Sequence, residues 1–234
     1  MNWFEPMDIY CERTDASFWA EPLNAWTNLS FIVAALVGLW LAVSMHRLTL
    51  ANTVLIVLAA SIGVGSFLFH TFANRWSDIA DVVPIWTFVV IYVLISLRGF
   101  YHLTWPRALR SFVITIAAVG LAFYLMPSSV DSNASFLNGS EQYAPAIVAL
   151  IIFGITLSVR KHPAASYIWA GLGIFIVSLA FRTFDNALCT ALPFGTHFGW
   201  HIFNGLLIGT LLIAIIRHGV PPGREAADRT ASLV

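Results

Sequence analysis

Two histidines four residues apart, His197 and His201, lie in the stretch Thr196-His-Phe-Gly-Trp-His. This stretch opens a run of about twenty apolar residues, long enough to cross a bilayer as a helix. On a helix the spacing stacks both imidazoles on one face, one turn apart. Two such imidazoles suit a divalent transition metal, and zinc is the usual occupant. The alternative is that each histidine only hydrogen-bonds a neighbouring helix.

A third metal ligand is available at His70, and Ser66 precedes it by four residues on the same helical face. Three protein ligands leave an open fourth position, where a water bound to zinc can reach a pKa of roughly 7. Asp81 is a candidate general acid or base beside that water, and the Ser66 hydroxyl could donate to an oxyanion. The alternatives are helix packing for Ser66 and a helix N-terminal carboxylate for Asp81; we assign Asp78 to that second role.

The elements that must position these residues are membrane helices. The chain has 234 residues, of which 59% are hydrophobic and 10% charged, with a mean hydropathy of +0.80. Soluble domains carry about a quarter charged residues, so we predict an all-α integral membrane protein with a seven-transmembrane-helix bundle. The predicted parts are an N-terminal segment (1–22), a seven-helix domain (23–218) and a tail (219–234). The spans are expected at about 23–45, 50–72, 78–98, 108–126, 142–159, 164–183 and 196–217.

Loop charges predict the orientation of the bundle. Most basic residues fall in the inner loops and tail if the N-terminus is outside and the C-terminus is cytoplasmic. In this orientation His70, Asp81, His197 and His201 share one depth near the outer surface, which favours a three-histidine zinc site. The formal net charge of zero gives no indication of a nucleic-acid partner. Lys161, the single lysine, lies in a predicted loop, which excludes a retinal Schiff base inside the bundle.

The predicted outer side also holds both cysteines, Cys11 and Cys189. An oxidising compartment would allow a bridge between them, and two free thiols are the alternative. The N-terminal segment is rich in acids, whose oxygens are the ligands that calcium prefers. The spacing is not that of an EF-hand, so a solvated acidic segment is an equal alternative. The oxygen ligands available there are Asp8, Glu12, Asp15, Glu21 and Asn24.

Five motifs follow one another through most of the chain. They are Tyr10-Cys11-Glu12; Glu21-Pro-Leu-Asn24 with Asn28; Ser66-x-x-x-His70 with Asp81-Val-Val-Pro84; Asp185-Asn186-Ala-Leu-Cys189; and His197-x-x-x-His201. Together they resemble the motifs of the alkaline ceramidase family. That family lies within the heptahelical hydrolase superfamily that also holds the progestin and adiponectin receptors.

The resemblance implies specific roles for these residues. It implies zinc on His70, His197 and His201, catalytic roles for Asp81 and Ser66, and a Cys11–Cys189 disulfide. It also implies calcium (Ca2+) binding by the N-terminal segment, with Glu12 and Glu21 as the best-matched ligands. Ile9 stands where the animal family members usually have an aspartate. The complete set of expected calcium ligands is Asp8, Tyr10, Glu12, Asp15 and Glu21.

We therefore expect a zinc-dependent (Zn2+) lipid amidase that cleaves ceramide or a related N-acyl lipid into a long-chain base and a fatty acid. The expected partners are the lipid substrate and the bilayer, with no nucleic acid and no obligate protein partner. Short loops and a compact tail favour a bacterial protein, placed in the inner membrane with its site facing the periplasm. The alternatives are a receptor or sensor of the adiponectin-receptor type with a structural zinc, and, ranked last, a metal transporter.

Overall fold

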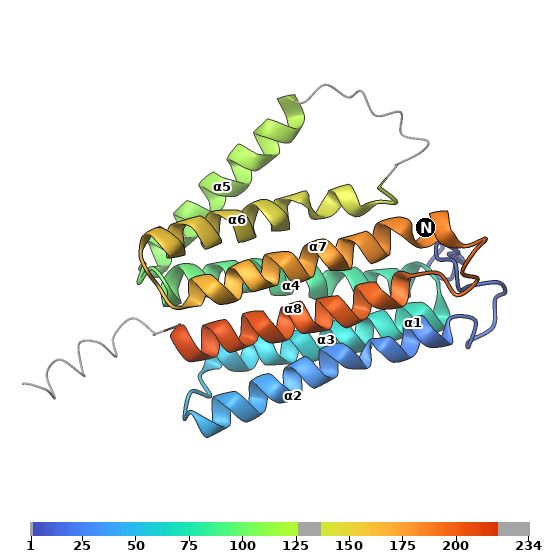
Figure 1. Cartoon of the computed structure of the whole chain (residues 1–234), viewed down its shortest axis with the longest axis horizontal. Helices are drawn as coiled ribbons and strands as arrows, with labels where there is room; N and C mark the ends of the chain where they lie inside the picture. Colours follow the sequence, from blue (N-terminus) through green and yellow to red (C-terminus); the bar gives the residue numbers. More distant parts are fainter. Residues whose placement is uncertain (1, 126–136, 220–234) are drawn as a thin grey trace, which may run out of the picture.

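The computed structural model of the chain describes residues 2–125 and 137–219, which form a bundle of long helices (Figure 1). No strand occurs within these described ranges, so the predicted all-helical class is confirmed. The elements in chain order are α1 (Pro22–Thr27), α2 (Leu29–Ser44), α3 (Leu50–Phe72), α4 (Arg75–Gly99), α5 (Trp105–Leu125), the 3-10 turn η1 (Ser140–Tyr143), α6 (Ala144–Val159), α7 (Ala164–Leu188) and α8 (His197–His218).

Local chemistry fixes where two helices, α1 and α4, begin. Pro22 occupies the first turn of α1, where the missing N–H costs no hydrogen bond. Helix α4 begins earlier than the predicted 78 because Asn74 and Ser77 form a capping box at its N-terminus. Asp78 lies in the first turn of α4, as expected for a carboxylate at the positive end of the helix dipole.

Helix α8 is the centre of the bundle. It packs against α7 and α2, and also against α1, α3 and α4. Of its most apolar stretch, 67% is buried, the largest share among the candidate membrane spans. In Figure 1, α8 runs between α7 and the α2–α3 pair, whereas α5 diverges from the bundle. The first residues of α8 are therefore held by neighbours on several sides.

Six candidate membrane spans occur in the described part of the chain. They are Pro22–Ser44, Leu50–Phe72, Arg75–Gly99, Ser140–Val159, Ala164–Leu188 and His197–His218. The seventh expected span, 108–126, coincides with α5, which is not among the six. The count of seven and the orientation of the termini stay predictions. Most of the expected loop 127–141 and of the tail 219–234 lies outside the described residues.

The candidate site residues gather at one end of the bundle. His70 lies in the last turn of α3, and His197 is the first residue of α8. The N-terminal segment lies at the end of the bundle where α8 begins (Figure 1). Helix α3 ends, and α4 and α8 begin, at this end of the bundle. The three histidines and Asp81 therefore lie near the same end, which agrees with the shared depth expected for them.

Candidate metal centre

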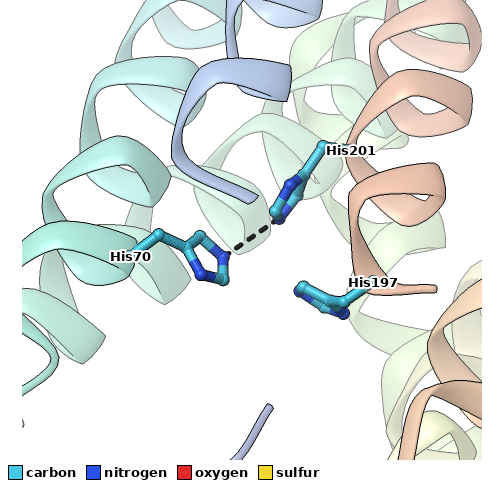
Figure 2. Close-up of side chains that lie close together, drawn as sticks. All are labelled: His70, His197 and His201. Carbon is cyan, nitrogen blue, oxygen red and sulfur yellow. Dashed lines mark hydrogen bonds between the residues drawn. The ribbon is translucent and has the colours of Figure 1, made fainter. Parts of the chain in front are cut away.

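Three buried histidines from two helices converge in the described part of the chain. His70 comes from α3, and His197 and His201 come from α8, one turn apart (Figure 2). One nitrogen from each ring lies within 4.8 Å of the other two, and each residue is only 1% exposed. Within the described ranges, this is the one group of three or more histidine, cysteine or acidic residues that could hold a metal ion.

The hydrogen bonds behind two of the rings fix their protonation. His70 Nδ1 lies 2.6 Å from the Glu21 carboxylate, which can only accept, so we assign the proton to Nδ1. His201 Nδ1 lies 3.0 Å from the Thr27 hydroxyl, whose own proton faces the carbonyls of Leu23 and Asn24. That hydroxyl therefore accepts from His201. The Nε2 atom of each ring is left with a lone pair.

These two lone pairs face each other, because His70 Nε2 lies 3.1 Å from His201 Nε2 (Figure 2). Facing lone pairs repel, and a cation shared between them removes the repulsion. Nδ1 of His197 is also buried and has no hydrogen-bond partner in the described part of the chain. Three neutral imidazoles with one open position are the donor set of a catalytic zinc site, so the residues present fit that metal.

Glu21 connects the histidine cluster to the N-terminal segment. Its Oε2 faces His70 Nδ1 and accepts from the Asn24 side chain, while Oε1 forms a 2.6 Å ion pair with Arg13. Burial acts to raise the pKa of the Glu21 carboxyl, but hydrogen bonds from His70, Asn24 and Arg13 hold it below its ordinary value. Glu21 is therefore an ionised carboxylate that orients His70, the arrangement common behind zinc-binding histidines.

Asp81 and Ser66 lie beside the cluster. Ser66 is buried on α3, one turn before His70. The electrostatic neighbours of the Asp81 carboxylate include His70, the Ser66 hydroxyl and Arg182. Oδ1 of Asp81 is buried and has no hydrogen-bond partner in the described ranges. The structure thus places both predicted catalytic residues next to His70, with a carboxylate oxygen available for a proton.

A close contact between α3 and α4 sets this arrangement. Pro84 lies inside α4 and has no N–H, so the Ala80 carbonyl one turn earlier loses its helical donor. Gly65 packs directly against that carbonyl, and a Cβ at Gly65 would overlap its oxygen. Such a Cβ would also lie 3.3 Å from the Asp81 Cα. The glycine therefore lets α4 approach next to Ser66, the neighbouring residue in α3.

An apolar cavity opens from the site into the bundle. Ser66 and His201 line it together with Asn204, and the remaining wall is almost entirely aliphatic and aromatic. Its wall comes from α2, α3, α4, η1, α6, α7 and α8. A hydrocarbon chain next to the polar cluster fits such a wall. The aromatic residues of the wall are Phe31, Trp86, Phe88, Tyr92, Tyr143, Phe153, Phe175 and Trp200.

A disulfide ties the N-terminal segment to the C-terminal end of α7. Cys11 and Cys189 are bonded, which confirms the predicted bridge. Next to it, the Cys11 N–H donates to Asp185 Oδ2. Tyr10 then stacks on the His197 ring with 3.6 Å between ring centroids, and its hydroxyl accepts from Arg182. The segment therefore covers the histidine cluster.

The expected calcium ligands do not gather into one set. Both oxygens of Glu12 accept backbone N–H groups of Leu23 and Asn24, at 2.7 Å each. Asp15 accepts from the Ser17 N–H, Asp8 is exposed, and the Tyr10 ring faces His197. Glu21 is paired with Arg13 and His70. These contacts give no support to calcium binding, which stays a prediction.

Sequence reasoning assigned no role to four residues that support the cluster. Thr27 and Arg13 bond to His201 and Glu21, and Asp185 and Arg182 hold the covering segment. A weak signal existed for Arg182, because a charged residue within an apolar span is costly and usually functional, and Asp185 opens the Asp-Asn-x-x-Cys motif. Thr27 and Arg13 carry no comparable signal, since their roles depend on how separate segments meet.

Comparison with known proteins adds an independent finding. The family model described as Ceramidase matches residues 10–223, which covers the histidine cluster, Asp81 and both cysteines. No curated protein matches the chain.

Proposed function

The chain belongs to the ceramidase family, and from that premise we propose that it is a zinc-dependent lipid amidase. The proposed reaction is hydrolysis of the amide bond of ceramide or a related N-acyl lipid, which gives a long-chain base and a free fatty acid. The family supports a ceramidase-like hydrolase over a receptor or sensor. Zinc as the metal and the precise lipid are the further steps of the proposal.

The observation that carries the metal assignment is the pair of facing Nε2 atoms of His70 and His201, 3.1 Å apart. Each of these rings has its other nitrogen bonded to an oxygen of Glu21 or Thr27. With His197 they form the proposed zinc ligands. Zinc bound there would supply a Lewis acid for the amide carbonyl and lower the pKa of a water molecule to roughly 7.

The chain's own residues then have defined tasks. We assign proton transfer to Asp81, whose Oδ1 has no hydrogen-bond partner in the described ranges. It would take the proton of the attacking water and return it to the leaving amine. The Ser66 hydroxyl, one turn from His70, would donate to the oxyanion that forms on the amide carbonyl. Glu21 and Thr27 would keep the two rings oriented throughout.

The apolar cavity supports a lipid as the substrate. Ser66 and His201 lie on its wall, so a chain inside it would place a polar amide beside the histidine cluster. A lipid in the surrounding bilayer could insert its chain between helices while its head group stays near the membrane surface. We propose that this surface is the outer one, with the periplasm beyond it in a bacterium, as the loop charges predict.

Purified protein provides the test. The protein is stripped of metal, given zinc and incubated with ceramide in detergent, and released fatty acid is measured by mass spectrometry. We expect release only with zinc, and none from His197→Ala under the same conditions. Equal release with and without zinc would contradict the proposal, as would full activity of the variant. A natural lipid extract, treated in parallel, would identify the amides that are cleaved.

A further inference from the structure

The guanidinium group of Arg13 is enclosed by oxygen atoms next to the histidine cluster. Its Nε donates to Glu21 Oε1 at 2.6 Å, and its Nη2 donates to the His70 carbonyl at 3.2 Å. Its Nη1 donates to the carbonyls of Asp15 and Ser17, at 3.2 and 3.5 Å. The Arg13 side chain is only 5% exposed. One carboxylate and three backbone carbonyls thus surround a buried positive charge.

This is the oxygen environment that a hard cation prefers, and it lies in the segment whose sequence resembles a calcium-binding pattern. The position is occupied by the guanidinium, which is covalently part of the chain. Glu21 is one of the two best-matched calcium ligands, but both of its carboxylate oxygens already accept hydrogen bonds from Arg13, Asn24 and His70. Glu12, the other, faces the backbone N–H groups at the start of α1.

A divalent ion added here would meet two obstacles. It would lie beside the positive charge of Arg13, and the like charges would repel each other in a poorly solvated place. It would also need six to eight oxygens, whereas the best-placed ones already accept hydrogen bonds. The residues present therefore do not fit calcium.

We propose that Arg13 is a built-in cation that replaces calcium in this chain, so that the N-terminal segment is fixed without any added ion. Arg13 reaches His70 twice, through the Glu21 carboxylate and through the His70 carbonyl itself. It is thus a positioning residue for His70. The positioning role of Arg13 rests on the metal site of the proposed function. The inference that the segment needs no calcium does not depend on that site.

The first measurement uses the wild-type protein and needs no activity. Thermal unfolding is followed in detergent at fixed free zinc while free calcium rises from about 10 nM to about 1 mM, the range over which protein calcium sites fill. We expect one unfolding temperature throughout. A rise in unfolding temperature that saturates with calcium would overturn the proposal, whether or not the protein hydrolyses lipid.

The second measurement compares the zinc affinity of Arg13→Ala, Arg13→Lys and the control Arg107→Ala, which changes an exposed residue of α5. Loss of an outer partner of a metal-binding histidine typically weakens affinity by about 10- to 100-fold. We expect a loss of that size for Arg13→Ala and none for Arg107→Ala. Arg13→Lys should recover most of the loss because it keeps the positive charge.

Wild-type affinity in Arg13→Ala would overturn the positioning role. A lysine variant as weak as the alanine variant would overturn the claim that the charge is what matters. If Arg13→Ala does not fold, the lysine variant and the wild-type calcium titration still decide the question. If the wild-type protein binds no zinc, the proposed function fails while the calcium titration remains a test of this inference.

Discussion

The backbone N–H of His197 donates a 2.9 Å hydrogen bond to the carboxylate of Asp185, which is fully buried. The same oxygen accepts the Thr196 N–H at 2.7 Å, and the other oxygen accepts the Cys11 N–H at 3.0 Å. A negative charge at a helix N-terminus is favourable, so Asp185 fixes the first residue of α8. It therefore holds a proposed metal ligand and the segment that covers it.

We expect Asp185→Asn to weaken both stability and metal binding. An amide offers one accepting atom where the carboxylate offers two, so either α8 or Cys11 loses its partner. Hydrogen bonds to charged groups contribute about 1.5–3 kcal/mol each. The free energy of unfolding should fall by about that amount, and zinc affinity should fall with it. Glu5→Gln, which makes the same carboxylate-to-amide change at an exposed residue, is the control, and equal behaviour of the two variants would refute this role.

Thr27→Val should lower zinc affinity without a large change in the fold. Valine keeps the shape of threonine but removes the acceptor for His201 Nδ1, so the ring loses its fixed orientation. Changes of this kind typically cost about 10- to 100-fold in metal affinity. Thr87→Val is a matched control, because that exposed hydroxyl donates to the Val83 carbonyl of its own helix. Zinc titrations of both variants would settle the point, and an unaltered affinity in Thr27→Val would count against the assigned proton positions.

Asp81→Asn and Ser66→Ala should reduce turnover while zinc remains bound. Proton transfer by a positioned side chain contributes roughly 10²- to 10⁴-fold, and one oxyanion donor roughly 10²- to 10³-fold. We expect kcat to fall by these factors, with bound zinc unchanged by metal analysis. A variant of Asp81 with wild-type turnover would exclude it as the proton carrier. Loss of zinc from either variant would instead indicate a role in metal binding.

Gly65→Ala should impair activity through the backbone. Its Cβ would overlap the Ala80 carbonyl oxygen, so α4 must move away from α3 and carry Asp81 away from Ser66. Overpacking of this kind typically costs about 1–3 kcal/mol of stability. Gly173→Ala is the control, since a Cβ there meets nothing within 4 Å among the residues that the structure describes. Unfolding temperature and turnover should fall only in the first variant; if both variants match the wild type, the contact does not position the site.

The helical class and the convergence of the three histidines could be predicted from sequence. Apolar runs long enough to cross a membrane have few alternatives to a helix, and alternating spans place residues at a common depth. That depth argument joined His70 to His197 and His201 across more than a hundred residues. The disulfide was also expected, because both cysteines lie on the predicted outer side and because the resemblance implies the bridge.

Other features depend on tertiary register and could not be predicted. Helix α7 continues to Leu188, beyond the expected 183, so Asp185 lies on a helix and faces the start of α8. Glu21 was expected to bind calcium, whereas its oxygens contact His70 and Arg13. No local pattern in the sequence specifies which cation a carboxylate will meet when distant segments fold together.

The measurement that tests the central claim most directly is the zinc content of the purified protein and of His70→Ala. This residue is the one proposed ligand from α3, and the other two come from α8, so it tests whether the two helices share one ion. We predict about one zinc per chain in the wild type and almost none in the variant after dialysis, with both helical by circular dichroism. Equal zinc in the two proteins would contradict the account.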